Sequence, residues 1–177
     1  MARHVVLLRG INLGPANRIA MAELREALTA AGFAGVRTYV QSGNIVVDSA
    51  HAPGEVAASV KQQLVDRFEV DVPVVARTAA ELAEVVARNP FPDEAALNPK
   101  ALQVTFRDDE AGPDAIAELQ ARATPTEKVA VIGREIYSWH PDGIARSKLA
   151  LAITPRNAAA TARNWTTVTT LLEMASA

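Results

Sequence analysis

The sequence contains no cysteine, and this absence excludes several kinds of site at once. Without a thiol in its 177 residues, the chain forms neither disulfides nor thiolate zinc sites and has no cysteine nucleophile. The three histidines, His4, His51 and His140, lie far apart and show no metal-ligand spacing. The adjacent acids at 108–110 follow a strand pattern and are expected in a solvated loop. We therefore expect no metal site and no cofactor.

A strong charge of either sign is also absent, as is any long hydrophobic run. The chain has 18 basic and 20 acidic residues, a net charge of -2, which argues against non-specific nucleic-acid binding. No apolar stretch approaches the roughly 20 residues that span a bilayer. The N-terminal "MARHVVLLRG" lacks the small-residue cleavage site of a signal peptide. We expect a cytoplasmic protein without a membrane association.

The hydrophobic pattern of the first half predicts alternating strands and helices. Short β-branched runs indicate strands, apolar residues at helical spacing indicate helices, and Gly43 marks a tight hairpin turn that needs a positive φ. The predicted strands cover 5–8, 36–40, 45–47 and 72–77, and the predicted helices cover 21–31 and 56–68. This β-α-β-β-α-β order is that of the ferredoxin-like split βαβ motif.

The second half repeats nearly the same order. After a helix at 78–88, the three prolines of "NPFPDEAALNP" mark a boundary, because proline continues neither a helix nor a central strand. A strand at 101–106, a helix around Ile116 and Leu119, and a hairpin turning at Gly133 follow, and the chain finishes with helical sequence. These patterns predict an α+β fold of two ferredoxin-like subdomains packed together. The predicted parts are residues 1–88, a proline-rich connection at 89–99, and residues 100–177.

Acidic residues are missing from two segments near the ends. Residues 1–22 contain three arginines and no acid, and residues 143–172 contain four basic residues and no acid. If these segments meet in space, they form a positive site that concentrates anionic ligands. The alternative is chance in a composition where arginine outnumbers lysine 14 to 4.

The segment "LLRGINLGPANRIAM" connects the first strand to the first helix and could bind an anion. Unpaired backbone N–H groups at the helix start would point into the loop, Asn12 and Asn17 would add neutral donors, and Arg9 and Arg18 would add charge. The loop has neither the Walker A pattern nor the G-x-G-x-x-G pattern of dinucleotide sites. The alternative is that these asparagines and glycines only form turns.

Two sets of side chains complete the candidate anion site. In a ferredoxin-like sheet the end of the first strand lies near the hairpin, and the C-terminal basic segment supplies the second set. The candidate ligand-binding residues are Arg9, Asn12, Asn17, Arg18, Gln41, Ser42, Asn44, Arg146, Lys148, Arg163 and Asn164. Turn hydrogen bonding is the alternative for Gln41 and Asn44, and helix capping is the alternative for Ser147.

Five segments resemble the DUF1697 proteins, a bacterial domain of unknown function. They are "LLRGINLG", "NRIAMAELREAL", "GFAGVRTYVQSGNIVV", "SKLALAI" and "ATARNWTTVTTLLEM". The resemblance implies two ferredoxin-like subdomains and no established activity. Pro15 and Arg18 stand where glycine and lysine are common in the family.

Three functions follow from these patterns, and whether the protein is an enzyme stays open. The first is binding of a small phosphorylated or nucleotide-like anion at the basic segments. If a reaction follows, Arg9, Arg146 and Arg163 would stabilise charge, and Lys148 or Tyr137 would donate a proton. The second is a non-catalytic module that binds a protein partner or a second copy. The third is single-stranded RNA or DNA binding. The predicted central strands lack the aromatic residues on which bases would stack, and this argues against it.

Overall fold

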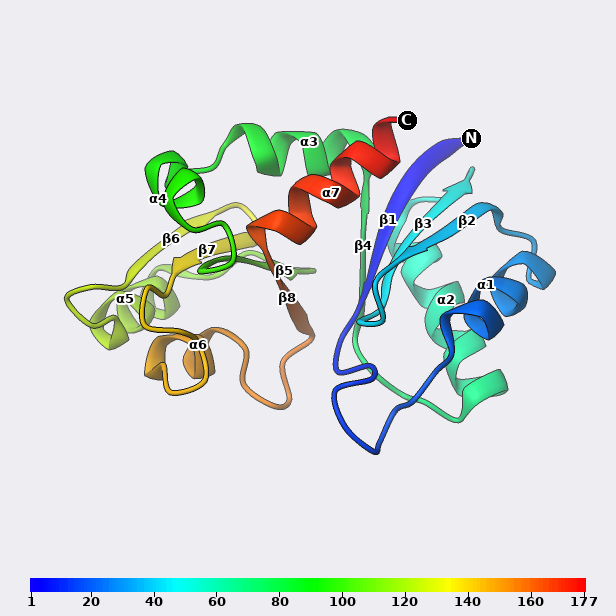
Figure 1. Cartoon of the computed structure of the whole chain (residues 1–177), viewed down its shortest axis with the longest axis horizontal. Coiled ribbons are helices and arrows are strands. Elements are labelled where there is room, and N and C mark those ends of the chain that lie inside the picture. The colour runs from blue at the N-terminus through cyan, green and yellow to red at the C-terminus, as the bar shows by residue number, and fades with distance from the viewer. The chain divides into compact units, whose positions relative to one another are not determined.

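The chain folds into two compact units in a computed structural model that describes all of residues 1–177 (Figure 1). Unit 1 contains Met1–Ala83 and Leu171–Ala177, and unit 2 contains Glu84–Thr170. This division differs from the predicted one, which placed the boundary at 89–99 and the whole C-terminus in the second half. The reason is that helices α3 (Ala79–Ala87) and α7 (Trp165–Ser176) each begin in one unit and end in the other.

Unit 1 has the predicted β-α-β-β-α-β order. Its elements before α3 are β1 (Ala2–Leu8), α1 (Met21–Ala30), β2 (Ala34–Tyr39), β3 (Asn44–Ser49), α2 (Pro53–Phe68) and β4 (Val74–Thr78). The strands form an antiparallel sheet in the order β2-β3-β1-β4. Gly43 has the predicted positive φ, 80°, in the turn between β2 and β3.

Unit 2 has a second antiparallel sheet, in the order β6-β7-β5-β8. Its elements after α3 are α4 (Pro92–Leu97), β5 (Leu102–Arg107), α5 (Pro113–Arg122), β6 (Lys128–Ile132), β7 (Glu135–Trp139), α6 (Lys148–Ile153) and β8 (Ala160–Asn164). The α+β class is thus confirmed, with one four-stranded sheet in each unit.

Two elements of unit 2 correct the sequence analysis. Strand β8 occupies residues read as helical sequence, because its pairing with β5, from Gln103–Asn164 to Arg107–Ala160, decides its conformation. Helix α4 lies inside the segment read as a connection. Pro92 begins that helix, where a missing N–H costs no hydrogen bond.

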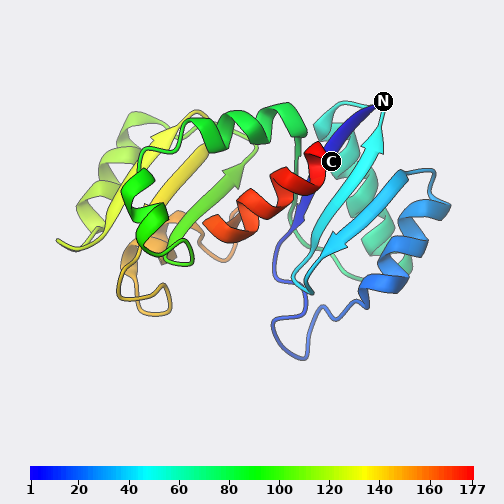
Figure 2. The same ribbon diagram turned by 45° about the horizontal axis from the view of Figure 1, so that its top comes forward.

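One face of the unit 1 sheet carries a continuous apolar core under helices α1 and α2 (Figure 2). Side chains alternate along a strand, so Val6 and Leu8 of β1 point to this face together with Ile45 and Val47 of β3. All four are fully buried among helix residues such as Leu24.

The other face of this sheet holds the end of α7, and the two chain ends lie close together in Figures 1 and 2. Arg3 Nη1 donates to Ala175 O at 3.2 Å, and Arg37 Nη2 donates to Met174 O at 2.6 Å. The last carbonyls of a helix lack partners within the helix and carry partial negative charge. The two arginines satisfy these carbonyls, and Arg3 also pairs with Asp48 at 3.0 Å.

The sheet of unit 2 is also covered on both faces. On one face, Leu119 of α5 and Leu149 and Ile153 of α6 pack on Ile136 of β7. On the other, α4 and Trp165 pack around Trp139. None of the helices in the chain is both long and apolar enough to cross a membrane.

Candidate functional site

The side chain of Asn12 holds the loop between β1 and α1 in a fixed shape. Its Nδ2 donates to Ile19 O at 2.9 Å and to Gln41 O at 2.7 Å, and its Oδ1 accepts from Ile19 N–H at 2.9 Å. The amide therefore uses both of its hydrogens and one acceptor position within unit 1. Asn12 shapes the predicted anion loop, and its side chain has no remaining donor for a ligand.

The end of β1 and the β2–β3 turn lie together, as the sequence predicted. Leu8 N–H donates to Gly43 O at 2.9 Å, in addition to the bond from Asn12 to Gln41. Asn44 is fully buried, and its Nδ2 donates to Tyr39 O and Ser42 Oγ. Asn44 thus has the turn-stabilising role that was the alternative in the sequence analysis.

The outer part of the loop is exposed. Asn17 and Arg18 lie at the surface, and the side chain of Asn17 makes only a long bond, 3.5 Å, to Gly10 O. Helix α1 begins after Ala20, which supplies no side-chain cap to the N–H groups of the first turn. Asn17, Arg18 and the first turn of α1 are the exposed groups of this loop that can contact an anion, and Arg9 at its start is half-buried.

Replacing Asn12 with alanine is expected to lower the free energy of unfolding by about 3 kcal/mol, because it removes three hydrogen bonds and leaves alanine at φ 57°. Asn17→Ala is the matched control, since Asn17 has a similar φ of 53° but only the one long bond. We expect a loss of about 1 kcal/mol for the control. Urea unfolding followed by far-ultraviolet circular dichroism measures both, and equal losses would mean that the amide does not hold the loop.

The predicted C-terminal candidates lie in unit 2, and two of them have structural roles. Arg163 is largely buried on β8, where burial lowers the pKa of its guanidinium to about 10, and its Nη1 donates to Thr161 Oγ1 and Ala162 O. Asn164 Oδ1 caps α7 by accepting from Thr167 N–H at 2.9 Å. Arg146 and Lys148 are exposed.

Tyr137, the other proton donor considered in the sequence analysis, lies in the interior of unit 2. Its hydroxyl is buried and donates to Val85 O at 2.7 Å. Burial and the nearby carboxylate of Glu135 both raise the pKa of the phenol well above its ordinary value, and Arg88 opposes them only partly. Ser147 has its predicted capping role, because its Oγ accepts from Ala150 N–H at 3.0 Å.

Strand pairing aligns the two sheets residue by residue. Arg77 of β4 pairs with Val5, and Arg163 of β8 pairs with Val104, and each arginine lies two residues before a helix. With Val5 matched to Val104, Leu8 corresponds to Arg107.

The aligned sheets differ in polarity on the face that α1 and α2 cover in unit 1 and α5 and α6 cover in unit 2. The apolar core positions of unit 1 that become polar in unit 2 are Val6, Leu8 and Val47, which correspond to Thr105, Arg107 and Ser138. A polar group in a core layer costs free energy unless it is paired. These three replacements therefore indicate that this layer of unit 2 is a candidate binding site.

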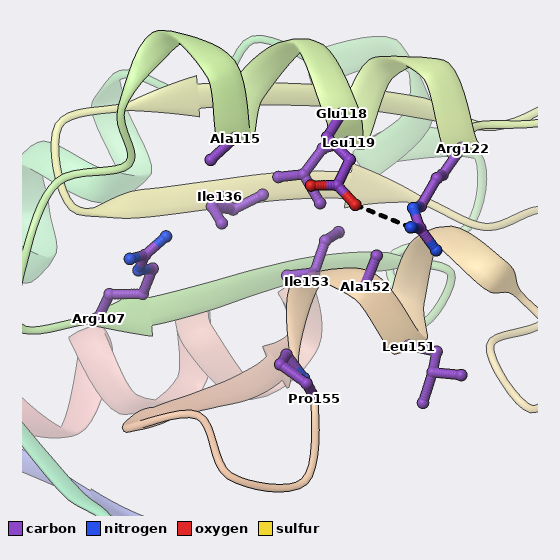
Figure 3. Close-up of a pocket in the computed structure, with 10 residues that line it drawn as sticks. All are labelled: Arg107, Ala115, Glu118, Leu119, Arg122, Ile136, Leu151, Ala152, Ile153 and Pro155. Carbon is purple, nitrogen blue, oxygen red and sulfur yellow. Dashed lines mark hydrogen bonds and ion pairs between the residues drawn. The ribbon is translucent and has the colours of Figure 1, made fainter.

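A cavity of about 360 Å³ lies in this layer, between α5, α6 and the sheet (Figure 3). Its walls are mainly apolar, with Leu119, Ile136 and Ile153 on the inside and Leu151, 68% exposed, at the rim. Arg107 lies at one end, and Arg122 of α5, paired with Glu118 at 2.7 Å, lies at the other (Figure 3). A mostly apolar cavity with a few charged groups at its ends is typical of a small-molecule site.

Arg107 can exchange one of its present partners, Asp109, for a ligand. Its side chain is 24% exposed and its Nη2 contacts both carboxylate oxygens of Asp109, at 3.2 and 3.3 Å. Asp109 is 78% exposed, and such an ion pair contributes little to stability. An anionic ligand in the cavity can take the place of Asp109 at the guanidinium.

A second group of polar side chains under α6 was missed in the sequence analysis. His140 Nδ1 lies 2.9 Å from Glu127 Oε1, and His140 Nε2 lies 2.9 Å from Ser138 Oγ. Ser147 Oγ–H also donates to Glu127 Oε1, and Thr124 N–H donates to Oε2 at 3.0 Å. Burial raises the pKa of Glu127, but the hydrogen bonds from Ser147, Thr124 and His140 outweigh it and lower the pKa to about 2.

The sequence does contain a signal for this group. Ser138 and His140 are two residues apart on a strand pattern, and so point to the same face. His140 was expected to be isolated because it shows no metal-ligand spacing, whereas Glu127, which reaches it, lies 13 residues away in the sequence. Among the side chains of the chain, no three of His, Cys, Asp or Glu are placed to bind a metal ion.

The sequence pattern of DUF1697, described as a protein of unknown function, matches residues 1–137. The chain belongs to the DUF1697 family. The structure of this DUF1697 protein is similar to that of the conserved bacterial protein SP0830 from Streptococcus pneumoniae. The TM-score is 0.79 with 21% sequence identity, over 98% of each chain, so the two share the fold. No curated protein matches the sequence.

Proposed function

We propose that this DUF1697 protein binds a small anionic molecule with an apolar part, and that it does so in the unit 2 cavity. The observation that carries the proposal is Arg107, which replaces the core residue Leu8 of unit 1 and lies at one end of a cavity of about 360 Å³. The ligand's phosphate or carboxylate binds Arg107 by charge-assisted hydrogen bonds. Its apolar part packs on Leu119, Ile136 and Ile153.

The loop between β1 and α1 is the other place where an anion could bind, as the sequence predicted. It offers Arg18 and the uncapped first turn of α1, but Glu23 lies in that same turn. We therefore propose Arg107 as the anion-binding residue, and we use substitution of Arg18 as the comparison in the binding test.

Phenyl phosphate is the probe, and isothermal titration calorimetry gives its affinity. Arg107→Ala is expected to weaken binding about 10-fold to 100-fold, because the charge-assisted bonds to the guanidinium are lost. Arg18→Ala, which removes an exposed arginine of unit 1, is expected to leave the affinity unchanged. Asp109→Asn is expected to strengthen binding by removing the competing carboxylate, and Asp108→Asn is its control.

Three results separate the alternatives. Loss of binding in Arg18→Ala with normal binding in Arg107→Ala would place the anion in the N-terminal loop. Equal affinity in both variants, or no heat of binding to the unsubstituted protein, would reject the cavity as an anion site.

Each unit is also, in our proposal, a ferredoxin-like subdomain. The support is the β-α-β-β-α-β order and the sheet order β2-β3-β1-β4, which recurs as β6-β7-β5-β8. Three observations support an origin of the two units by duplication. The units share the same strand order, Arg77 and Arg163 occupy matched positions, and a helix begins two residues after each arginine.

A further inference from the structure

Ser138, His140 and Glu127 form a linear chain of hydrogen bonds in unit 2. The Ser138 Oγ to His140 Nε2 distance and the His140 Nδ1 to Glu127 Oε1 distance are both 2.9 Å. The hydroxyl meets one ring nitrogen and the carboxylate meets the other. This is the relation of nucleophile, base and orienting acid in Ser–His–carboxylate enzymes, which is recognised by geometry rather than by order in the sequence.

Glu127 is held in place by more than the histidine. Ser147, the capping residue of α6, donates to the same oxygen that contacts His140, and Thr124 N–H donates to the other. These bonds keep the carboxylate ionised and fix its direction. An ionised, immobile carboxylate at Nδ1 keeps the proton of a neutral imidazole on that nitrogen, which leaves Nε2 as the base toward Ser138.

A small cavity lies against the serine and the histidine. It has a volume of about 50 Å³ and is lined by Ser138, His140, Gln103 and Thr105, with Ile144, 51% exposed, at its edge. This volume exceeds what a water molecule needs and accommodates a small acyl group such as acetyl. The cavity is separate from that at Arg107, although Ile153 lines both.

Gln103 supplies a donor on the opposite strand. It pairs with Ser138 across the β5–β7 ladder and lines the same cavity. Its Nε2 donates one hydrogen to Lys100 O at 3.0 Å, and the amide carries a second. That hydrogen can stabilise an oxyanion that forms beside Ser138.

We infer that Ser138 is the nucleophile of an acyl-transfer site for esters of small carboxylic acids. Ser138 Oγ attacks the ester carbonyl carbon while its proton passes to His140 Nε2. The C–O bond to the alcohol then breaks, and the alcohol leaves with that proton. Water attacks the acyl-serine and gives a proton to His140, the carboxylic acid leaves, and Ser138 regains its proton, so the sum is ester and water to acid and alcohol.

This inference goes beyond the proposed anion binding, and its test does not require the anionic ligand. Methanesulfonyl fluoride, a reagent small enough for the cavity, transfers its sulfonyl group to an activated serine with loss of fluoride. Peptide mass spectrometry locates the label, and p-nitrophenyl acetate hydrolysis measures turnover. We expect labelling of Ser138, its loss in Ser138→Ala, and a fall of about 100-fold in hydrolysis in that variant.

Two variants serve as controls. Ser59→Ala changes an exposed serine of unit 1 and is expected to alter neither signal. Glu127→Gln retains the shape of the side chain and is expected to slow labelling of Ser138. Trp139, buried beside Ser138 on β7, reports by its emission whether each variant keeps the fold of unit 2. Absence of label at Ser138 in the folded protein, or hydrolysis unchanged in a folded Ser138→Ala variant, would overturn the inference.

Discussion

Glu127→Ala is expected to lower the free energy of unfolding by about 3 kcal/mol. The substitution removes an ionised carboxylate whose side chain is only 6% exposed, and it leaves His140, Ser147 and Thr124 N–H without their acceptor. Removing the acceptor costs several kcal/mol because His140, whose side chain is 1% exposed, stays buried with a ring nitrogen left unpaired. Urea unfolding at neutral pH, followed by the tryptophan fluorescence of unit 2, measures the loss.

The same carboxylate makes stability depend on pH in acid. Its pKa is about 2 in the folded protein against an ordinary value of 4.5, so the folded state favours the ionised form. The resulting stabilisation of about 3 kcal/mol is complete above pH 4.5 and is lost as the pH falls from 4.5 toward 2. Glu127→Gln is expected to remove this part of the acid dependence.

Glu110→Ala is the control for both measurements, because Glu110 is an exposed acid of the same unit. We expect it to change the free energy of unfolding by less than about 0.5 kcal/mol. A loss below about 1 kcal/mol in Glu127→Ala, or an unchanged acid dependence in Glu127→Gln, would show that the network does not hold the carboxylate as described.

Gly43→Ala is expected to destabilise unit 1 by about 3 kcal/mol. The glycine has φ 80°, and a Cβ at this position would lie 2.7 Å from Leu8 Cβ. Leu8 is fully buried in the core under α1 and α2, so neither side can move without disturbing the core or the turn. The left-handed conformation of alanine adds about 1 kcal/mol to the cost of the clash.

Gly133→Ala separates the two causes. Gly133 lies in the corresponding hairpin turn of unit 2 with φ 60°, but the nearest atom to an added Cβ is Glu135 Oε2 at 4.0 Å. This variant has the backbone cost without the clash, so a loss of about 1 kcal/mol is expected in urea unfolding. Equal losses in the two variants would contradict the contact between Gly43 and Leu8 as the cause.

Most of the fold is predictable because its elements follow local patterns. The runs at Val5–Leu8 and the glycines at both hairpin turns indicated strands and turns that the structure contains. Strand β8 was missed because "ATARN" has a single β-branched residue and continues directly into helix α7. Its hydrogen bonds to β5 join residues more than 50 positions apart, and no local pattern reports them.

The candidate site was less predictable, because the same residue types serve turns and ligands. Asn12 and Asn44 were expected near one another and are, but their amides bond to the backbone of unit 1. Arg107 had no signal in the sequence. Arg107 became a candidate only when the two sheets were aligned, because it occupies the position in unit 2 that corresponds to the core residue Leu8 of unit 1.

A thermal melt of Arg107→Leu with and without phenyl phosphate tests most directly whether the polar groups of this layer are present to bind a ligand. The substitution gives unit 2 the core residue of unit 1, so burial of the leucine replaces the weak pair with Asp109. We expect the variant to melt at the same temperature as the unsubstituted protein or higher, and phenyl phosphate to have no effect on it. A lower melting temperature would mean that Arg107 is part of the structural core, and a ligand-induced shift equal to that of the unsubstituted protein would mean that the anion binds elsewhere.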